Sequence, residues 1–131
     1  MRLVQPPSVV ARWLAAGDSG DIGAFDDLLH SDVVVHAPQG LSTQDLESEK
    51  QVWRDASTAM PDLRHEVQEV VAEEHLEMAR VVVTGTRRHD FAGVTGNGRS
   101  FRMDQAVICH LDNGKITEAW ELADVGSPDD Q

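Results

Sequence analysis

Hydrophobic residues change their spacing near the middle of the chain, at Pro61. Before this proline they recur every three to four positions, which is typical of amphipathic helices. After it they alternate with polar residues, which is typical of strands that bury one face. We therefore expect an α+β fold in which a curved antiparallel sheet wraps over N-terminal helices.

The two patterns predict three helices and five strands. Helical spacing runs over residues 8–29 with a turn at 17–20, and a third helix is expected from a cap at Ser42 or Thr43 to about Ala59. Alternation and β-branched residues predict strands at 32–36, 64–73, 77–88, 101–111 and 115–124.

The length of 131 residues matches one domain. We expect this domain over residues 1–125, followed by a loose tail at 126–131 that has no apolar anchor. Cys109, the single cysteine, lies in an apolar run and is expected to be a buried core residue. The six histidines lack the short spacing of zinc ligands, so no metal site is expected.

Acidic residues outnumber basic ones by 23 to 11, which gives a formal net charge of −12. This charge repels the phosphates of nucleic acids and of anionic membranes. No apolar run is long enough to span a bilayer, and the N-terminus lacks the apolar stretch of a secretory signal. We therefore expect a cytoplasmic protein with no nucleic-acid and no membrane partner.

Several short motifs follow one another in a characteristic order. They are residues 60–64 (MPDLR), 83–86 (VTGT), 98–99 (GR), 113–120 (NGKITEAW) and Asp124. In order and spacing they resemble the SnoaL-like polyketide (ester) cyclase family, within the nuclear transport factor 2-like superfamily. With the early helices and the strand at 32–36, the resemblance spans nearly the whole chain.

The resemblance implies a cone-shaped barrel around an internal pocket, and a homodimer. It also implies ring closure of an aromatic polyketide by intramolecular aldol condensation, with an aspartate as acid/base and without a metal or cofactor. Asp124 matches the position of that aspartate. Ala119 and Val107 depart from the family pattern, because many relatives have His and Asp at these two positions.

The role implied for Asp124 depends on where its side chain points. An aldol condensation needs a base beside a carbonyl and a group that stabilises the enolate. We expect Asp124 to lie buried among Trp120 and Leu122 at the wall of the pocket. The alternative from the residues alone is a solvated carboxylate at the end of a strand.

The register of the hairpin at Asn113-Gly114 determines which residues share a face with Asp124. A two-residue turn pairs Val107 with Trp120 and matches apolar to apolar residues. The face of Asp124 then holds Phe101, Met103, Gln105, Val107, Cys109, Leu111, Ile116, Trp120 and Leu122.

A three-residue turn pairs Leu111 with Lys115 instead. It brings Arg102, Asp104 and His110 onto the face of Asp124 and assembles a polar group there. We prefer the two-residue turn, because a slip of one residue exposes a whole apolar set.

In the preferred register Gln105 is a polar neighbour of Asp124, and we expect it to hydrogen-bond a substrate carbonyl. His36 closes the first strand and is expected to reach a substrate oxygen at the mouth of the pocket. Trp13 and Phe25 are expected in the core. The side chains expected to line the pocket are Trp53, Met60, Met103, Val107, Trp120 and Leu122.

Three functions remain open. The first is a polyketide cyclase with a small aromatic substrate. The second is an epoxide hydrolase-like or isomerase-like enzyme that uses Arg102, Asp104 and His110, although the families of this fold with these activities use tyrosine, which the chain lacks. The third is a noncatalytic ligand-binding or dimerisation domain, which Ala119 and Val107 favour. We carry the cyclase forward.

Overall fold

The computed structural model describes residues 8–124. Its helices are α1 (Val9–Ser19), the short 3-10 helix η1 (Ile22–Ala24), α2 (Phe25–Leu28) and α3 (Leu46–Ala59). Its strands are β1 (Leu29–His36), β2 (Arg64–Ala72), β3 (Leu76–Thr86), β4 (Ser100–Asp112) and β5 (Lys115–Ala123). The order agrees with the change of period at Pro61. The tail predicted at 126–131 lies outside the described residues.

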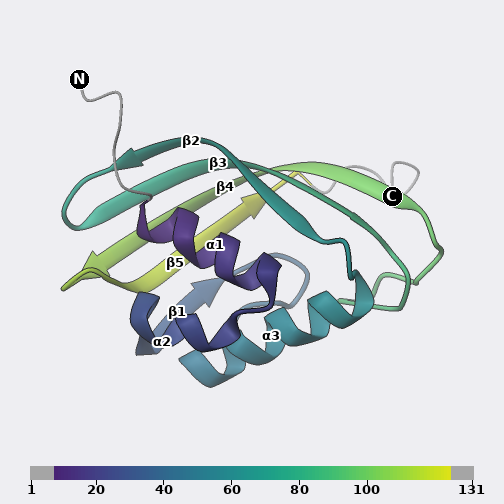
Figure 1. The fold of residues 1–131 in the computed structure, drawn as a ribbon, viewed down its shortest axis with the longest axis horizontal. Helices are drawn as coiled ribbons and strands as arrows, with labels where there is room; N and C mark the ends of the chain where they lie inside the picture. Colours follow the sequence, from purple (N-terminus) through teal and green to yellow (C-terminus); the bar gives the residue numbers. More distant parts are fainter. Residues whose placement is uncertain (1–7, 125–131) are drawn as a thin grey trace.

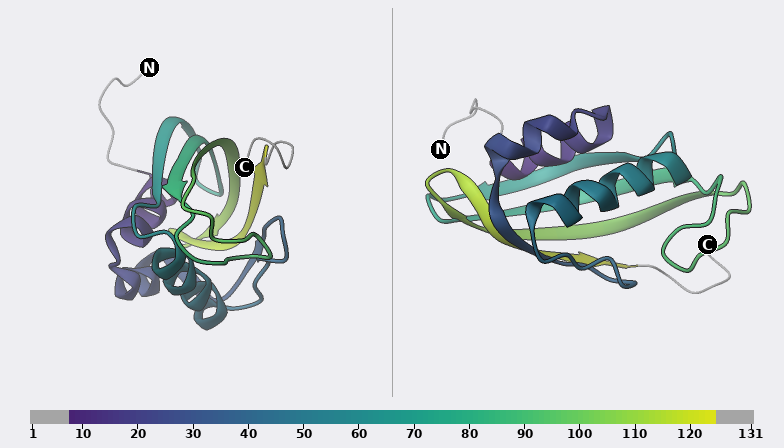
Figure 2. Two further views of the ribbon diagram at one scale, coloured as in Figure 1. Left: turned by 90° about the vertical axis from the view of Figure 1, so that its right-hand side faces the viewer. Right: turned by 90° about the horizontal axis from the view of Figure 1, so that it is seen from below.

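The five strands form one curved sheet in the order β1-β5-β4-β3-β2 (Figure 1). Strands β2 to β5 are the expected antiparallel meander. Strand β1 pairs with β5 in parallel, so the sheet is mixed, and β1 and β2 remain as separate edges. Figure 2 shows α1 and α3 on the concave face of this sheet. None of the described helices is long and apolar enough to cross a bilayer.

Helix α1 is held at both ends. The Ser8 hydroxyl accepts a hydrogen bond from the Ala11 N–H at 3.1 Å, and Gly20 ends the helix in a left-handed conformation with φ of 80°. The buried Glu77 carboxylate of β3 also accepts from the backbone N–H groups of Val9 and Val10, at 3.3 and 2.8 Å. This carboxylate anchors the start of α1 to the sheet.

Gly17 allows α1 to approach α3 closely, because a Cβ at this position would overlap the indole of Trp53. Trp53 lies edge-on to Trp13 and Phe25, with ring centroids 6.3 and 5.9 Å away. Trp13, Phe25 and Cys109 are all fully buried, which confirms the expected core positions.

Helix α3 begins later in the chain than expected, because its N-cap is neither Ser42 nor Thr43. Its N-cap is Asp45, which forms a reciprocal capping box with Ser48, and these bonds lower the pKa of Asp45. The expectation of a cap at Ser42 or Thr43 is wrong because both hydroxyls have other partners. Ser42 bonds to the backbone of the preceding loop, and Thr43 donates to Glu49.

The hairpin between β4 and β5 has the expected two-residue turn. Asn113 and Gly114 both have positive φ, of 52° and 77°, and Leu111 pairs with Ile116. Beyond Ile116 the extra residue Thr117 forms a bulge that shifts the remaining pairs by one position.

The bulge makes both expected registers wrong along the rest of the hairpin. Val107 pairs with Glu121, and neither with Trp120 nor with Ala119. Because paired residues share a face, Glu121 turns toward the helices, and Trp120 and Leu122 turn to the outer face of the sheet.

Candidate functional site

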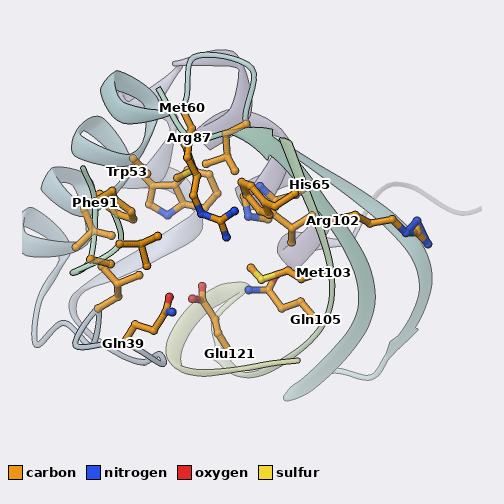
Figure 3. Close-up of a pocket in the computed structure, with 18 of the residues that line it drawn as sticks. Gln39, Trp53, Met60, His65, Arg87, Phe91, Arg102, Met103, Gln105 and Glu121 are labelled. Carbon is orange, nitrogen blue, oxygen red and sulfur yellow. The ribbon is translucent and has the colours of Figure 1, made fainter. Parts of the chain in front are cut away.

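A cavity of about 330 Å³ lies between α3 and the inner face of β4 and β5 (Figure 3). The start of β2 and the connections from β1 to α3 and from β3 to β4 complete its wall. Its apolar lining consists of Leu41, Val52, Trp53, Ala56, Met60, Leu63, Val83, Phe91, Ala92, Val94, Phe101 and Met103. Such a lining suits a small organic ligand with a flat apolar body.

Glu121 presents a carboxyl group to this cavity (Figure 3). The residue as a whole is half-buried, and its carboxyl group is withdrawn from bulk water by the surrounding side chains. Burial, together with the negative charge of nearby Glu49, raises the pKa of Glu121 to about 8. The carboxyl of Glu121 is therefore mostly protonated at neutral pH.

Glu49 of α3 is a second carboxyl group at the cavity wall, and it is 2% exposed. It accepts hydrogen bonds from the Thr43 hydroxyl at 2.7 Å and from the Trp53 Nε1–H at 2.9 Å. Burial raises the pKa of Glu49, and these two bonds oppose the rise. Glu121 has no such donor among the described residues, so Glu49 is better suited to carry the charge and Glu121 to carry the proton.

Two residues that line the cavity, Arg87 and Gln105, each have a buried polar atom. Neither atom has a hydrogen-bond partner among the described residues. The atoms are Nη1 of Arg87 and Oε1 of Gln105. The Arg87 guanidinium lies over the Phe101 ring, 4.3 Å from its centroid. Figure 3 shows Arg87 and Glu121 pointing toward the middle of the cavity from opposite sides. A buried polar atom without a partner costs about 1–3 kcal/mol, so both atoms favour a polar ligand.

His65, the second residue of β2, also lines the cavity. Its ring Nδ1 lies 2.7 Å from Oδ1 of Asp18 in α1, and its backbone N–H donates to Oδ2 of the same carboxylate at 2.5 Å. The ring packs against Trp53, with centroids 5.0 Å apart. Asp18 and Trp53 thus fix the orientation of the imidazole.

A model of the SnoaL-like polyketide cyclase family matches residues 8–131 of this sequence. The chain belongs to this family. Several solved structures share its fold. IdmH from Streptomyces antibioticus is 29% identical, with a TM-score of 0.76 and coverage of 88% of this chain and 89% of that one. A SnoaL-like polyketide cyclase from Agrobacterium tumefaciens is 18% identical, with a TM-score of 0.75 and coverage of 92% and 94%.

The fold extends to more distant proteins. A protein with a ketosteroid isomerase-like fold from Catenulispora acidiphila, solved with trimethylamine, is 14% identical, with a TM-score of 0.79 and coverage of 94% and 90%. No curated protein matches this SnoaL-like chain. The resemblance and the fold class expected from the sequence are confirmed, with a curved sheet that is open and mixed.

Four residues expected at the pocket of this SnoaL-like chain line the cavity: Trp53, Met60, Met103 and Gln105. Val107 is fully buried in the core, and Leu122 is exposed on the outer face of the sheet. Neither lines the cavity, so the expectation that they line the pocket is wrong. The roles of the four lining residues in substrate binding stay predictions.

Asp124 is exposed, so the expectation that it lies buried among Trp120 and Leu122 is wrong. It stands just after β5 at the edge of the cavity, where its backbone N–H donates to the Asp104 carbonyl at 3.0 Å. The bulge explains the difference, because it gives the inward position to Glu121.

His36 lies on the outer face of the sheet and not at the mouth of the cavity. Its ring stacks on Trp120 at 5.3 Å, and its Nε2 lies 2.6 Å from a carboxylate oxygen of Glu118. His110 contacts the other side of this group, with its ring edge-on to Trp120 at 4.8 Å. The expected placements of His36 and Trp120 in the pocket are therefore wrong.

His110 of this SnoaL-like protein does not line the cavity, whereas Arg102, Asp104 and Asp124 all lie at its edge. Arg102 and Asp104 are exposed at the edge of the cavity, and Figure 3 shows the Arg102 side chain pointing away from it. Within residues 8–124, no group of three or more His, Cys, Asp and Glu is arranged to hold a metal ion.

The sequence arguments missed Glu121, Arg87 and the pair of Asp18 and His65. His65 has a signal in the sequence, because it alternates with Leu63 and Val67 and so shares their inward face. Glu121 has no comparable signal, since its direction depends on the bulge.

Proposed function

We propose that this SnoaL-like chain closes a ring in a small polyketide or related aromatic carbonyl compound by intramolecular aldol condensation. In this proposal Glu121 supplies a proton to the reaction. The observation that carries it is the carboxyl group of Glu121 in a largely apolar cavity, opposite the guanidinium of Arg87. Membership of the family supports a cyclase or a related activity.

The chemistry of ring closure matches the groups in the cavity. A carbon beside one carbonyl loses a proton, and the resulting enolate carbon attacks a second carbonyl of the same molecule. One C–C bond forms, and the second carbonyl oxygen becomes an alkoxide that takes up a proton. The neutral carboxyl of Glu121 suits this protonation, and the buried Nη1 donor of Arg87 suits stabilisation of the enolate oxygen.

The open cavity also favours an enzyme over a noncatalytic domain. A core plugged by Trp and Met side chains would support binding through surfaces only. Here Trp53 and Met60 lie in the wall and leave about 330 Å³ free, with a carboxyl group and two unpartnered polar atoms facing the space. Oε1 of Gln105 suits a hydroxyl group of the ligand, because it can only accept.

The proposal is tested with Glu121→Gln, a change of one carboxyl to an amide of the same shape. Purified protein is incubated with a tricyclic polyketide methyl ester, and the ring-closed product is detected by chromatography. We expect the fold to persist and kcat to fall on the order of 100-fold, because the amide cannot supply the acidic proton.

Asp124→Asn is the matched control, because it makes the same chemical change at an exposed position at the edge of the cavity. We expect its turnover to stay close to that of the wild type. The reverse result, with loss of turnover in Asp124→Asn alone, would assign the reaction to Asp124 and contradict the role of Glu121.

We also propose that two chains associate through the outer face of the sheet. Val71, Met78, Ile108 and Trp120 pair with one another in sequence across β2, β3, β4 and β5, and so form one apolar row. Val71 is 63% and Met78 43% exposed. Exposed apolar rows of this kind support a protein interface.

A further inference from the structure

An aldol closure that Glu121 assists as a donor still needs a proton acceptor. The carbon beside the carbonyl must lose its proton before any C–C bond forms. A carboxyl that already carries its proton cannot accept this one. The acceptor must therefore be another group at the cavity wall.

The contacts of His65 leave one of its ring nitrogens able to accept. A carboxylate only accepts hydrogen bonds, so the 2.7 Å contact between Nδ1 and Asp18 fixes the hydrogen of the neutral ring on Nδ1. The lone pair is then on Nε2, and the two ring nitrogens point in widely different directions. Nε2 has no hydrogen-bond partner among the residues that the structure describes.

The position of the imidazole is fixed from two further sides. Asp18 also accepts the backbone N–H of His65, and the side chains of Asp18 and His65 are only 16% and 10% exposed. Trp53 packs against the ring, and its own Nε1–H is bonded to Glu49. A side chain held in this way is ready for proton transfer without reorganisation.

We infer that His65 is the base of the reaction and that Asp18 is its positioning residue. This inference rests on the proposed function. The proton moves from the carbon to Nε2 of His65, and its electron pair forms the enolate, whose oxygen faces Arg87. After the C–C bond forms, the alkoxide takes the proton of Glu121. Transfer of the proton from Nε2 to the Glu121 carboxylate, through water in the open cavity, restores both groups.

The first test determines which ring nitrogen of His65 carries the hydrogen, and it needs no substrate. Protein labelled with 15N-histidine is measured by NMR, which distinguishes a ring nitrogen that carries hydrogen from one that does not. In the neutral ring of the wild type we expect hydrogen on Nδ1 of His65 and none on Nε2. Asp18→Asn should mix the two tautomers, because an amide both donates and accepts. Hydrogen on Nε2 of the neutral wild-type ring would overturn the inference.

The second test isolates proton removal from ring closure. The probe is 2-tetralone, a two-ring ketone whose C1 protons exchange with deuterium when it enolises. The exchange is followed by proton NMR in D2O. We expect His65→Gln to slow exchange at least about 100-fold relative to the wild type. Glu121→Gln should retain more exchange than His65→Gln, because Glu121 acts only after the enolate, whose oxygen faces Arg87, has formed.

His75→Gln is the control for histidine replacement. His75 lies in the connection between β2 and β3, its side chain is 70% exposed, and it does not line the cavity. Its exchange rate should equal that of the wild type. Exchange that survives His65→Gln would overturn the role of His65 and leave the proposed function standing. Wild-type exchange no faster than in buffer would overturn both.

Discussion

The proton on Glu121 makes the stability of the folded chain depend on pH. In the unfolded chain this carboxyl titrates near 4.5, and in the folded chain near 8. Between these values the folded state binds the extra proton, so its stability falls as pH rises from about 5 to about 8 and then levels off. Glu49, whose pKa is also raised, adds a change of the same sign.

Urea denaturation of the wild type and of Glu121→Gln at pH 6 and pH 8.5 checks this prediction. The wild type should lose more unfolding free energy between the two pH values than the variant does. The histidines, Glu49, Arg87 and Cys109 are common to both proteins, so the difference reports on Glu121. An equal loss in both proteins would contradict the raised pKa.

Sequence reasoning at the scale of single residues succeeded where alternation alone decides the direction of a side chain. Gln105, Met103 and the aromatic Trp53 reach the cavity because a regular strand and a regular helix place them there. Asp124 is exposed and Glu121 takes the inward position, because one inserted residue reverses the two faces of a strand. The free energy that favours one direction of a side chain over the other comes from packing in the folded protein. The spacing of residues in the sequence does not specify this packing.

Among the elements, α1 depends on a carboxylate from the sheet. Replacing Glu77 by alanine leaves the backbone N–H groups of Val9 and Val10 without their acceptor in a buried site. We expect Glu77→Ala to lower the unfolding free energy by about 2 kcal/mol or more. Urea denaturation at pH 7 measures this loss.

Glu74→Ala is the control for the loss of a glutamate. Its side chain is 86% exposed, close to Glu77 along the chain. We expect its unfolding free energy to stay within about 0.5 kcal/mol of the wild type. A loss in Glu77→Ala no larger than in Glu74→Ala would show that α1 does not depend on this anchor.

The elements themselves could be predicted because their signals are local. The change of period at Pro61 and the Asn113-Gly114 turn each act over a few residues. The N-cap of α3 could not be predicted, since Ser42, Thr43 and Asp45 all have side chains that cap helices. Contacts distant in sequence or space decide among them, such as the bond from Thr43 to Glu49.

At the scale of the whole molecule, the proposed association predicts that a charge on the outer face of the sheet lowers the molecular mass in solution. Met78→Glu places a charge in the apolar row of the outer face, and we expect it to convert a dimer into a 14.4 kDa monomer. Gel filtration with light scattering measures the mass. Gln51→Glu adds the same charge at an exposed position of α3 and should remain dimeric. A monomeric wild type would contradict the proposed interface.

The order of helices and strands along the chain could be predicted. The strands at the two edges of the sheet could be predicted less well. Helices followed by a meander left few arrangements for a chain of this length. The parallel pairing of β1 with β5 joins residues some 85 positions apart in the sequence, and no local pattern encodes it. With this pairing the sheet stays open, and β1 and β2 are its edges.

The missing side chain at Gly17 has a consequence for the choice of ligand. The Trp53 indole forms part of the cavity wall and fills, on its reverse side, the room that Gly17 leaves vacant. A bulkier amino acid in α1 would push the indole forward and shrink the chamber. Selectivity can therefore be retuned from a position that no ligand touches. Variant libraries designed to accept new substrates should therefore randomise Gly17 as well as the residues that line the cavity.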